Sequence, residues 1–408
     1  MYILLYNISQ MNTLKQIIDL SELALADLNK YPKKRYLYQK LAPKKSKHFT
    51  GIVGPRGVGK TILLKHLASK DKGACYISLD SFDDCDLFDV IRELNENYKI
   101  TSFFIDEIHF NENYSKSLKK IYDFLNVKLT FTSSVALSII DSSYDLSRRV
   151  NLHYLYPFSF REYLFFKFDK KVPCISLRDI FSNKISSELL KLDSHFDKYL
   201  SGGLMPFTLD EPDFMPLMSN ILNKIIQKDI PSFASIKVEE INKIKKVVKF
   251  IGKSEVDGLN FSSVAKNIGI TKYKAESYIN LLNKSFILNP VFPVGTNVLH
   301  EPKILMFLPY RLLYKDFVNS IGGLREDFFC ETMLAANIPF NYLKTKRGAK
   351  TPDYYIQYND EKIVVEVGGK SKGREQFKGI TDKKKFIFSH SSIIDKLRRP
   401  LFLLGLLN

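Results

Sequence analysis

The chain has 408 residues, which is enough for two to four domains, and 45% of them are hydrophobic, an ordinary value for a globular protein. Its net charge of +17 favours a polyanionic partner such as nucleic acid, or an anionic membrane surface; a lysine-rich bias of the whole proteome is the alternative. The four cysteines form no Cys-x-x-Cys pair, which argues against a disulfide framework or a zinc site. No stretch reaches the ~18 apolar residues that span a bilayer, so we expect a cytoplasmic protein that does not bind membranes.

The first part of the chain changes from a helical pattern to an alternating one. Residues 1–47 read as a basic, helical N-terminal segment. From residue 48 to 165, short β-branched or aromatic runs alternate with helical stretches, which predicts a core built on a parallel sheet with helices on both faces. The expected strands are residues 48–53, 74–79, 101–105, 128–132 and 150–155.

Residues 54–61 read Gly-Pro-Arg-Gly-Val-Gly-Lys-Thr, a complete G-x-x-x-x-G-K-[ST] phosphate loop between a predicted strand and a predicted helix. The glycines let backbone N–H groups point at phosphate oxygens, and the helix N-terminus favours negative charge. The lysine adds a positive charge at the β and γ phosphates, and the threonine hydroxyl can bind Mg²⁺. The loop therefore predicts ATP and Mg²⁺ as cofactors, bound through Gly54, Gly57, Gly59, Lys60, Thr61 and Ile62.

An apolar strand that ends in two acids follows 45 residues after Thr61, at Asp106 and Glu107. We expect Asp106 to lie beside Thr61 and bind Mg²⁺, and Glu107 to activate the attacking water as a general base. The alternative is a pair of solvated acids that cap a strand. His109 is more simply a structural residue than a catalyst.

Two further positions of the core are candidates for contact with the γ-phosphate. The expected strand 128–132 runs into Ser133 and Ser134, and either hydroxyl could sense the phosphate or instead cap a helix. Arg148 or Arg149 could act in trans as an arginine finger, which would require a homo-oligomer; a surface or lid salt bridge is the alternative.

Taken in order, these blocks resemble the archaeal and bacterial AAA-type ATPases that carry a C-terminal DUF4143-like region. Residues 155–164, Leu-Tyr-Pro-Phe-Ser-Phe-Arg-Glu-Tyr-Leu, are especially typical of that family, and residues 199–206 resemble its Gly-Gly-x-Pro element with one extra residue before the proline. The resemblance extends over residues 10–400 and is strongest over 48–206. It implies an AAA+ core, ATP hydrolysis, a helix-turn-helix module and a nuclease-like tail, and it names no substrate.

The middle of the chain is expected to hold a helical lid over residues 166–250 and a winged-helix-like module over residues 251–300. In the module, Gly269 fits the turn between two helices and Thr271 fits the N-cap of the second. That second helix carries Lys272 and Lys274. It could contact DNA, or the module could bind another domain or protein.

Residues 301–408 are expected to form a nuclease-like α/β domain, because three acids resemble the PD-(D/E)xK pattern of restriction endonucleases. Such acids would bind Mg²⁺ and activate water against a phosphodiester. Gly368 stands where the pattern has lysine, and an extended strand would return Lys370 to the same face as the third acid. Residues 341–408 carry 15 Lys and Arg against 7 Asp and Glu, which favours nucleic-acid binding. The candidate residues are Glu326, Asp353, Glu366 and Lys370.

The sequence thus predicts an α/β AAA+ phosphate-loop core with a helical lid, a winged-helix-like module and a C-terminal restriction-endonuclease-like α/β domain. The leading function is Mg²⁺-dependent ATP hydrolysis that acts on or with nucleic acid. The alternative is a nucleotide-controlled switch or scaffold of the STAND type, which hydrolyses ATP slowly, binds a protein partner and carries a degenerate nuclease-like tail. Whether the tail cleaves or only binds nucleic acid stays open.

Overall fold

The computed structural model describes residues 2–42, 46–81, 86–135, 146–211, 213–295, 301–343, 351–370, 372–378, 382 and 384–407. The chain forms two compact units. Unit 1 comprises residues 1–155 together with residues 228–235, and unit 2 comprises residues 156–227 and 236–408. Of the expected lid over 166–250, therefore, only residues 228–235 belong to the same unit as the phosphate loop.

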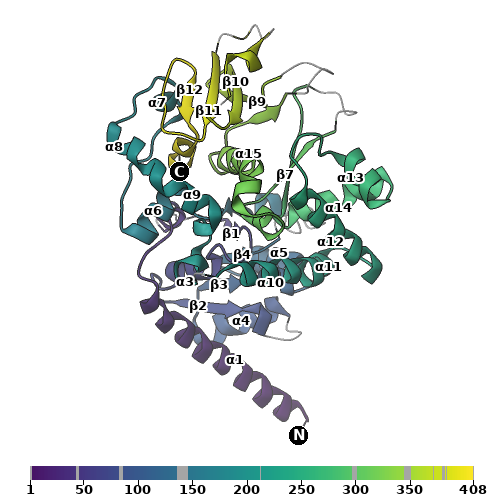
Figure 1. Cartoon of the computed structure of the whole chain (residues 1–408). Coiled ribbons are helices and arrows are strands. Elements are labelled where there is room, and N and C mark those ends of the chain that lie inside the picture. Colours follow the sequence, from purple (N-terminus) through teal and green to yellow (C-terminus); the bar gives the residue numbers. More distant parts are fainter. Residues whose placement is uncertain are drawn as a thin grey trace. The chain divides into compact units, whose positions relative to one another are not determined.

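Unit 1 is built on a five-stranded parallel sheet in the order β2-β3-β4-β1-β5 (Figure 1). Each strand falls within one residue of the range that the sequence predicts, so the predicted parallel α/β core is confirmed. The register pairs Val53 with both Ser133 and Tyr154, and Ser78 with Asp106. The strands are β1 (Phe49–Val53), β2 (Ala74–Ser78), β3 (Ser102–Asp106), β4 (Lys128–Ser133) and β5 (Val150–Tyr154).

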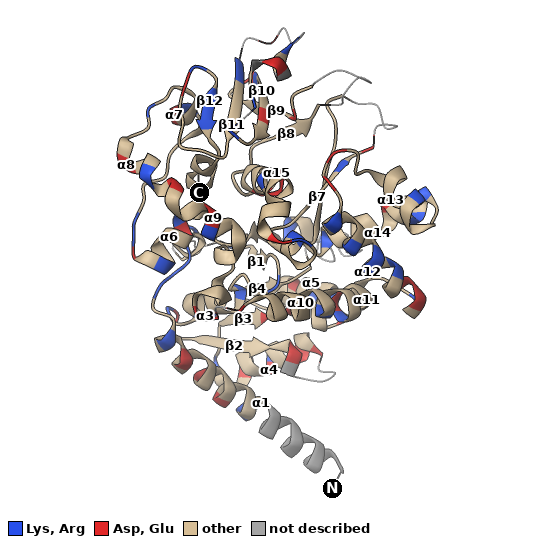
Figure 2. Ribbon diagram, in the orientation of Figure 1, with Lys and Arg blue, Asp and Glu red and all other residues tan. Residues whose placement is uncertain are grey.

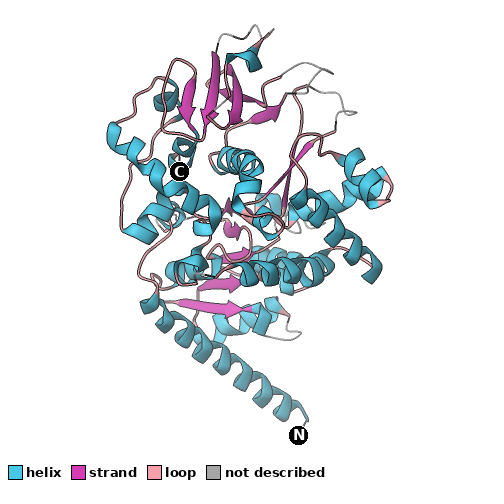
Figure 3. Ribbon diagram, viewed as in Figure 1, coloured by secondary structure: helices cyan, strands magenta, loops and turns pink. Residues whose placement is uncertain are grey.

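Helices flank this sheet (Figure 3). Side chains of α1, α4 and α5 join those of the strands in one buried cluster, whereas α3 contacts β2, β3 and β4 from outside that cluster. The helices of unit 1 are α1 (Tyr2–Ala26), α2 (Tyr36–Leu41), α3 (Lys60–Ala68), α4 (Leu87–Tyr98), α5 (Tyr114–Phe124) and α11 (Ile230–Phe233).

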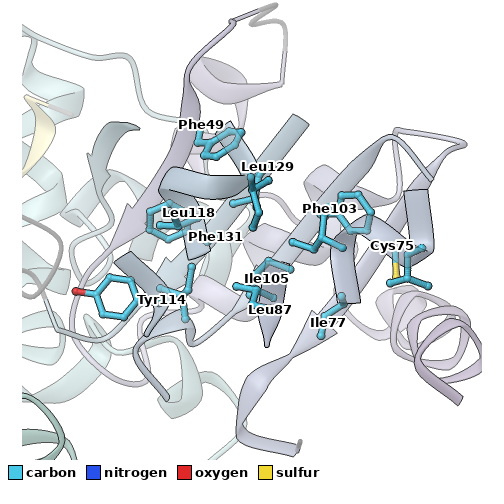
Figure 4. Close-up of a cluster of buried hydrophobic side chains, with 14 of the residues drawn as sticks. Phe49, Cys75, Ile77, Leu87, Phe103, Ile105, Tyr114, Leu118, Leu129 and Phe131 are labelled. Carbon is cyan, nitrogen blue, oxygen red and sulfur yellow. The ribbon is translucent and has the colours of Figure 1, made fainter. Parts of the chain in front are cut away.

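The buried cluster explains why the sheet forms where it does (Figure 4). Every residue of β3 is buried, and Phe103, Ile105 and Phe131 are fully inaccessible to solvent. Burial of one such side chain contributes about 1.5–3 kcal/mol. Since parallel strands point the same way, the carboxyl ends of β1, β3 and β4 meet at one edge of the sheet, where α/β proteins bind ligands.

The first part of unit 2 is mainly helical. In it, residues 269–271 connect α13 (Phe261–Ile268) to α14 (Lys272–Lys284): Gly269 has a positive φ of 72°, which suits the left-handed turn, and Thr271 caps α14. The two-stranded antiparallel sheet of β6 (Leu288–Val291) and β7 (Lys303–Met306) follows. The helices are α6 (Phe160–Phe168), α7 (Leu177–Phe181), α8 (Ser187–Leu190), α9 (Phe196–Lys198), α10 (Met215–Lys224), α12 (Val238–Lys253), α13 (Phe261–Ile268) and α14 (Lys272–Lys284).

The C-terminal part of unit 2 combines the long helix α15 (Phe317–Ala335) with a mixed five-stranded sheet in the order β12-β11-β10-β9-β8. Strands β8, β9 and β10 are antiparallel neighbours, while β11 and β12 run parallel to β10. The strands are β8 (Phe340–Tyr342), β9 (Tyr354–Tyr358), β10 (Glu361–Gly368), β11 (Lys384–Ser389) and β12 (Arg398–Pro400). In the described part of the chain, no helix is both long and apolar enough to cross a membrane.

Candidate active site

The phosphate loop connects the end of β1 to the start of α3. Gly57 and Gly59 have φ values of 81° and 87°, which residues with a side chain rarely adopt. A Cβ atom on Gly54 would lie 2.1 Å from the carbonyl oxygen of Leu155, so only glycine fits there. Helix α3 begins at Lys60, and its N-terminus carries a partial positive charge next to the loop. Ile62 lies in the first turn of α3 and is half-buried.

Lys60 is buried and its ammonium group turns back on the loop. Its Nζ donates hydrogen bonds of 3.0 Å to the carbonyl oxygens of Gly54 and Pro55. Burial lowers the pKa of Lys60, and the nearby carboxylates of Glu107 and Asp106 oppose that effect. The ammonium group of Lys60, which the sequence predicts to bind phosphate, therefore lies inside the phosphate loop.

Asp106, at the carboxyl end of β3, accepts hydrogen bonds from three side-chain hydroxyl groups. Thr61 Oγ1 donates to Asp106 Oδ2 at 2.7 Å, and Tyr76 Oη donates to the same oxygen at 2.9 Å. Thr132 Oγ1 donates to the other oxygen, Oδ1. A hydroxyl and a carboxylate oxygen in direct contact are ligands of the type that Mg²⁺ prefers. The two residues expected to hold the ion are thus side by side.

Glu107 is held in a left-handed backbone conformation with a φ of 51°. Its Oε1 lies 3.8 Å from Arg56 Nη1, its Oε2 lies 3.4 Å from His109 Nδ1, and the backbone N–H of Ser134 donates to Oε2 at 3.2 Å. Burial raises the pKa of Glu107, but the charges of Lys60 and Arg56 and the hydrogen bond from Ser134 are among the effects that outweigh it, and the net shift is downward. Glu107 is therefore ionised at neutral pH, as a general base must be.

His109 connects Glu107 with the end of β4. Its Nδ1 lies 3.3 Å from Ser133 Oγ, and its Nε2 lies 3.4 Å from Ser134 Oγ. Burial lowers the pKa of His109, so the imidazole is neutral at pH 7. Ser133 Oγ also donates to the carbonyl oxygen of Val135 at 3.0 Å. The neutral imidazole of His109 thus lies between the two serine hydroxyls and the carboxylate of Glu107.

Arg56, at the third position of the phosphate loop, forms a bidentate ion pair with Asp229. Nε lies 2.5 Å from Oδ2, and Nη2 donates to Oδ1 at 2.9 Å. The side chain of Asp229 is 1% exposed and that of Arg56 is 13% exposed. Asp229 directly precedes α11, in the segment 228–235 that belongs to unit 1.

The two arginines expected to act in trans follow a short helical turn at Leu146–Arg148. Arg148 is exposed. Arg149 forms a two-pronged ion pair with Asp123 of α5, at 3.0 Å between Nη2 and Oδ1, and its guanidinium lies over the ring of Tyr122. Arg149 is thus held by its own chain, which corresponds to the salt-bridge alternative.

The three acids of the C-terminal domain lie close to one another, and two lysines form ion pairs with them. Lys303 Nζ lies 2.5 Å from Glu326 Oε2 and 4.0 Å from Asp353 Oδ1. Burial raises the pKa of Asp353, and Glu326 and Glu366 add to that rise. Glu366 Oε2 is buried and has no hydrogen-bond partner among the described residues.

Lys370 is exposed, and the lysine that pairs with Glu366 is Lys372, at 2.5 Å between Nζ and Oε1. The expectation for Lys370 assumed that the strand continues through it, whereas β10 ends at Gly368. Because the chain turns there, the side-chain alternation of an extended strand no longer applies. The side chain of Lys372 would also lie within 2.5 Å of a Cβ on Gly368, so glycine makes room for it.

Sequence reasoning missed several residues of both sites. Arg56 stood at a variable position of the motif, and Asp229 lies 173 residues further along the chain with no motif around it. Tyr76 and Thr132 are ordinary strand residues of β2 and β4, the two neighbours of β3 in the sheet. For Lys303, which lies on β7, no sequence signal points to the acid cluster.

Family models match two regions of the chain. The model of an AAA domain matches residues 46–164, and the model of a domain of unknown function, DUF8612, matches residues 193–307. Together with the parallel sheet, the first match supports an AAA-type ATPase with a phosphate-loop core. The second model is DUF8612, so the expected DUF4143-like region is not confirmed.

One relative resembles the chain over most of its length. The uncharacterized protein MJ1637 of Methanocaldococcus jannaschii is 26% identical over 405 residues, which cover 88% of this chain and 85% of the relative. This match extends well beyond the AAA domain.

Similar solved structures are more distant. AMPPCP-bound DnaA from Aquifex aeolicus is 14% identical, with a TM-score of 0.25 over 60% of this chain and 84% of its own. PCH-2 of C. elegans is 14% identical, with a TM-score of 0.23 over 65% and 68%. Drosophila ORC bound to AT-rich DNA and Cdc6 is 9% identical, with a TM-score of 0.24 over 72% and 93%. At such TM-scores the likeness carries no functional argument.

Proposed function

We propose that the protein is a Mg²⁺-dependent ATPase. The observation that carries this proposal is the contact between Thr61 and Asp106, which lie 2.7 Å apart next to the ionised Glu107. Hydroxyl and carboxylate ligands, a helix N-terminus and a buried lysine supply what a nucleoside triphosphate with its metal ion requires.

Each residue has a distinct part in this reaction. Thr61 and Asp106 would hold Mg²⁺, which when bound neutralises charge on the phosphates. Lys60 would leave the carbonyl oxygens of its own loop and bind the β and γ phosphates. Glu107 orients a water molecule and accepts its proton, and Ser134 and His109 keep the carboxylate in place.

The test compares two variants with the wild-type protein. Glu107→Gln should bind ATP with unchanged affinity and lose turnover by about 100-fold or more, because general-base catalysis contributes about 10²–10⁴-fold. Lys60→Ala should weaken nucleotide binding itself. The matched control is Glu112→Gln, an exposed acid in the same region. Undiminished hydrolysis by Glu107→Gln would reject the assigned role.

We further propose that nucleic acid is the partner, with the STAND-type scaffold as the competing function. Lysine side chains gather on α12 and α14, with one more on α13, and β6 and β7 follow these helices in the chain, an order that supports a winged-helix-like module (Figure 2). Duplex and single-stranded DNA should bind with an affinity that falls steeply with salt, and should stimulate the ATPase. A scaffold would show neither effect and would instead retain a protein partner.

The C-terminal acids do not fit a divalent ion, because the ammonium group of Lys303 already lies among them. Within the described residues, no group of three or more His, Cys, Asp or Glu side chains is arranged to hold a metal. We therefore propose a nuclease-like domain that binds nucleic acid through Lys372 and its basic surroundings without cutting it. Incubation with plasmid and Mg²⁺ or Mn²⁺ tests this: cleavage lost in Asp353→Ala would contradict it.

An arginine that acts in trans would require the protein to assemble into a homo-oligomer. If Arg148 reaches a neighbouring subunit, ATP turnover per chain should rise with protein concentration, and Arg148→Ala should abolish that rise. Sedimentation with ATP in the Glu107→Gln background measures whether a homo-oligomer forms.

A further inference from the structure

The ion pair between Arg56 and Asp229 leaves one part of the guanidinium uncommitted. Nε and Nη2 both contact Asp229, at 2.5 and 2.9 Å. The third nitrogen, Nη1, lies 3.8 Å from Glu107 Oε1, which is too long for a hydrogen bond. Among the described residues, no acceptor lies within hydrogen-bond distance of Nη1. Its two N–H groups therefore remain available beside the carboxylate that activates water.

Stability alone explains this arrangement poorly. Removing two charges from water costs several kcal/mol, so a buried ion pair is weak reason for placing an arginine and an aspartate here. The guanidinium is planar, with a fixed fork of donors on each edge. When Asp229 binds one edge in two-pronged geometry, the direction of the remaining donors is fixed. A lysine could not be aimed in this way.

We propose that Arg56 contacts the terminal phosphate of ATP in cis, and that Asp229 is the positioning residue that aims it. This inference rests on the proposed ATPase function. In phosphoryl transfer, negative charge spreads over the equatorial oxygens of the γ-phosphate, and a cation already in place stabilises that charge. Arg56 lies in the phosphate loop and close to Glu107, so its guanidinium and the attacking water meet at the same phosphate.

Several charged side chains surround the pair of Arg56 and Asp229, and a bound triphosphate would change the balance of charge among them. Glu107 and Asp229 act electrostatically on Arg56, and both of them, together with Asp106, also act on Lys60. Burial lowers the pKa of Arg56, but Asp229 and Glu107 outweigh that effect, so the guanidinium stays charged. It is therefore a permanent cation at this position, whatever the pH of the assay.

The kinetic test uses the full-length protein and four variants. Arg56→Ala should lower kcat about 100-fold or more while nucleotide affinity changes less than about tenfold, as expected for a cation that acts on the transition state. Arg56→Lys should remain slow, because an ammonium lacks the fork. Asp229→Asn should lower kcat about tenfold, and Asp229→Glu should recover most of it. Unchanged kcat in Arg56→Lys and Asp229→Asn would overturn the inference.

A matched control comes from another arginine–aspartate pair of the same unit. Arg92 and Asp89 lie 3.0 Å apart on the exposed face of α4. Arg92→Ala and Asp89→Asn should leave kcat and KM unchanged. Thermal melting of every variant separates loss of folding from loss of positioning: a kcat that follows melting temperature across all variants would assign a purely structural role.

Mixing experiments decide between cis and trans. Arg56→Ala chains combined with Lys60→Ala chains should recover no activity if Arg56 serves its own site, whereas recovery would show that it serves a neighbour and would refute the proposal. A second measurement does not need turnover. In the Glu107→Gln background, Arg56→Ala should lose the preference for ATP over ADP in a binding assay. If wild-type protein hydrolyses no ATP, the proposed function fails, and this preference still tests Arg56.

Discussion

Two backbone positions near the phosphate loop, Glu107 and Gly54, are sterically restricted. A left-handed conformation of a residue with a side chain costs about 1–2 kcal/mol, and Glu107 adopts it at the end of β3. Its carboxylate then contacts His109 and accepts a hydrogen bond from the N–H group of Ser134. Strain of this kind persists at functional sites because the surrounding contacts over-determine it.

Gly54→Ala should disrupt the phosphate loop, because its Cβ would lie 2.1 Å from the backbone oxygen of Leu155. The backbone must move, which costs about 1–3 kcal/mol for a substitution that overpacks a well-ordered site. We expect a lower melting temperature and much weaker ATP binding.

The matched control for that substitution is Gly322→Ala. Gly322 lies in α15, and no atom approaches within 4 Å of a Cβ placed there. Alanine favours a helix by about 0.5–1 kcal/mol over glycine, so this variant should be as stable as wild type or more so. Equal behaviour of the two variants would contradict the steric argument.

At the scale of elements, α15 organises the C-terminal part of unit 2 with residues spaced four apart. Gly323, Asp327 and Glu331 share one face of the helix. The guanidinium of Arg311 fits against Gly323, and its Nε and Nη2 donate to Asp327 at 2.7 and 3.0 Å. Glu331 accepts the backbone N–H of Leu308 at 3.0 Å. This polar stripe thus lies beside the buried apolar residues of the same helix, such as Leu324 and Phe328.

Glu331 makes unit 2 sensitive to pH. Burial, reinforced by the charge of Asp327, raises the pKa of Glu331 to about 8, against 4.5 for a free glutamate. Between these values the folded state holds a proton that the unfolded state releases. This contribution to stability is complete below about pH 4.5 and is lost as the pH rises through about 8. Glu331→Gln removes the dependence.

We therefore expect Glu331→Gln to gain stability relative to wild type between pH 6 and pH 9. One pKa unit corresponds to about 1.4 kcal/mol, so the difference should reach about 1–3 kcal/mol. Urea unfolding followed by circular dichroism measures it. Glu255→Gln, at an exposed surface position, is the control and should shift little. A constant difference between Glu331→Gln and wild type across this range would contradict the buried carboxyl.

At the scale of the whole molecule, the candidate nucleotide site is assembled from distant parts of the chain. Residues 228–235 belong to unit 1, although the chain on either side of them belongs to unit 2. Because Asp229 of this segment pairs with Arg56, we expect a change in Arg56 on nucleotide binding to be felt in residues 228–235, whose chain continues into unit 2 at both ends.

Hydrogen exchange should reveal that connection in the full-length protein. With ATP bound to Glu107→Gln, amide exchange should slow in residues 54–61 and 106–110, and also in residues 228–235. ADP should protect the first region more than the last, since Arg56 is proposed to contact the γ-phosphate. In Lys60→Ala all three regions should be unaffected. Protection confined to residues 54–61 would contradict the coupling.

The core of unit 1 could be predicted because its signals are local. Alternating buried strands and helices predicted all five strands, and the phosphate-loop motif placed Lys60 and Thr61 on the loop and helix that the structure contains. Asp106 could be paired with Thr61 because parallel strands end at the same edge of a sheet. Lys370 shows the limit: its assignment needed a strand that continued beyond Gly368, and a turn intervenes.

The parallel sheet, the phosphate loop and the acids at the end of β3 could be predicted from the sequence, because they depend on periodicity and on the spacing between neighbouring elements. The pairing of Asp229 with Arg56, the place of Lys303 among the C-terminal acids and the pairing of Lys372 with Glu366 became visible only in the folded chain. Such contacts join residues from separate elements through the path of the folded chain. No residue type or local pattern encodes which distant partner a charged side chain will meet.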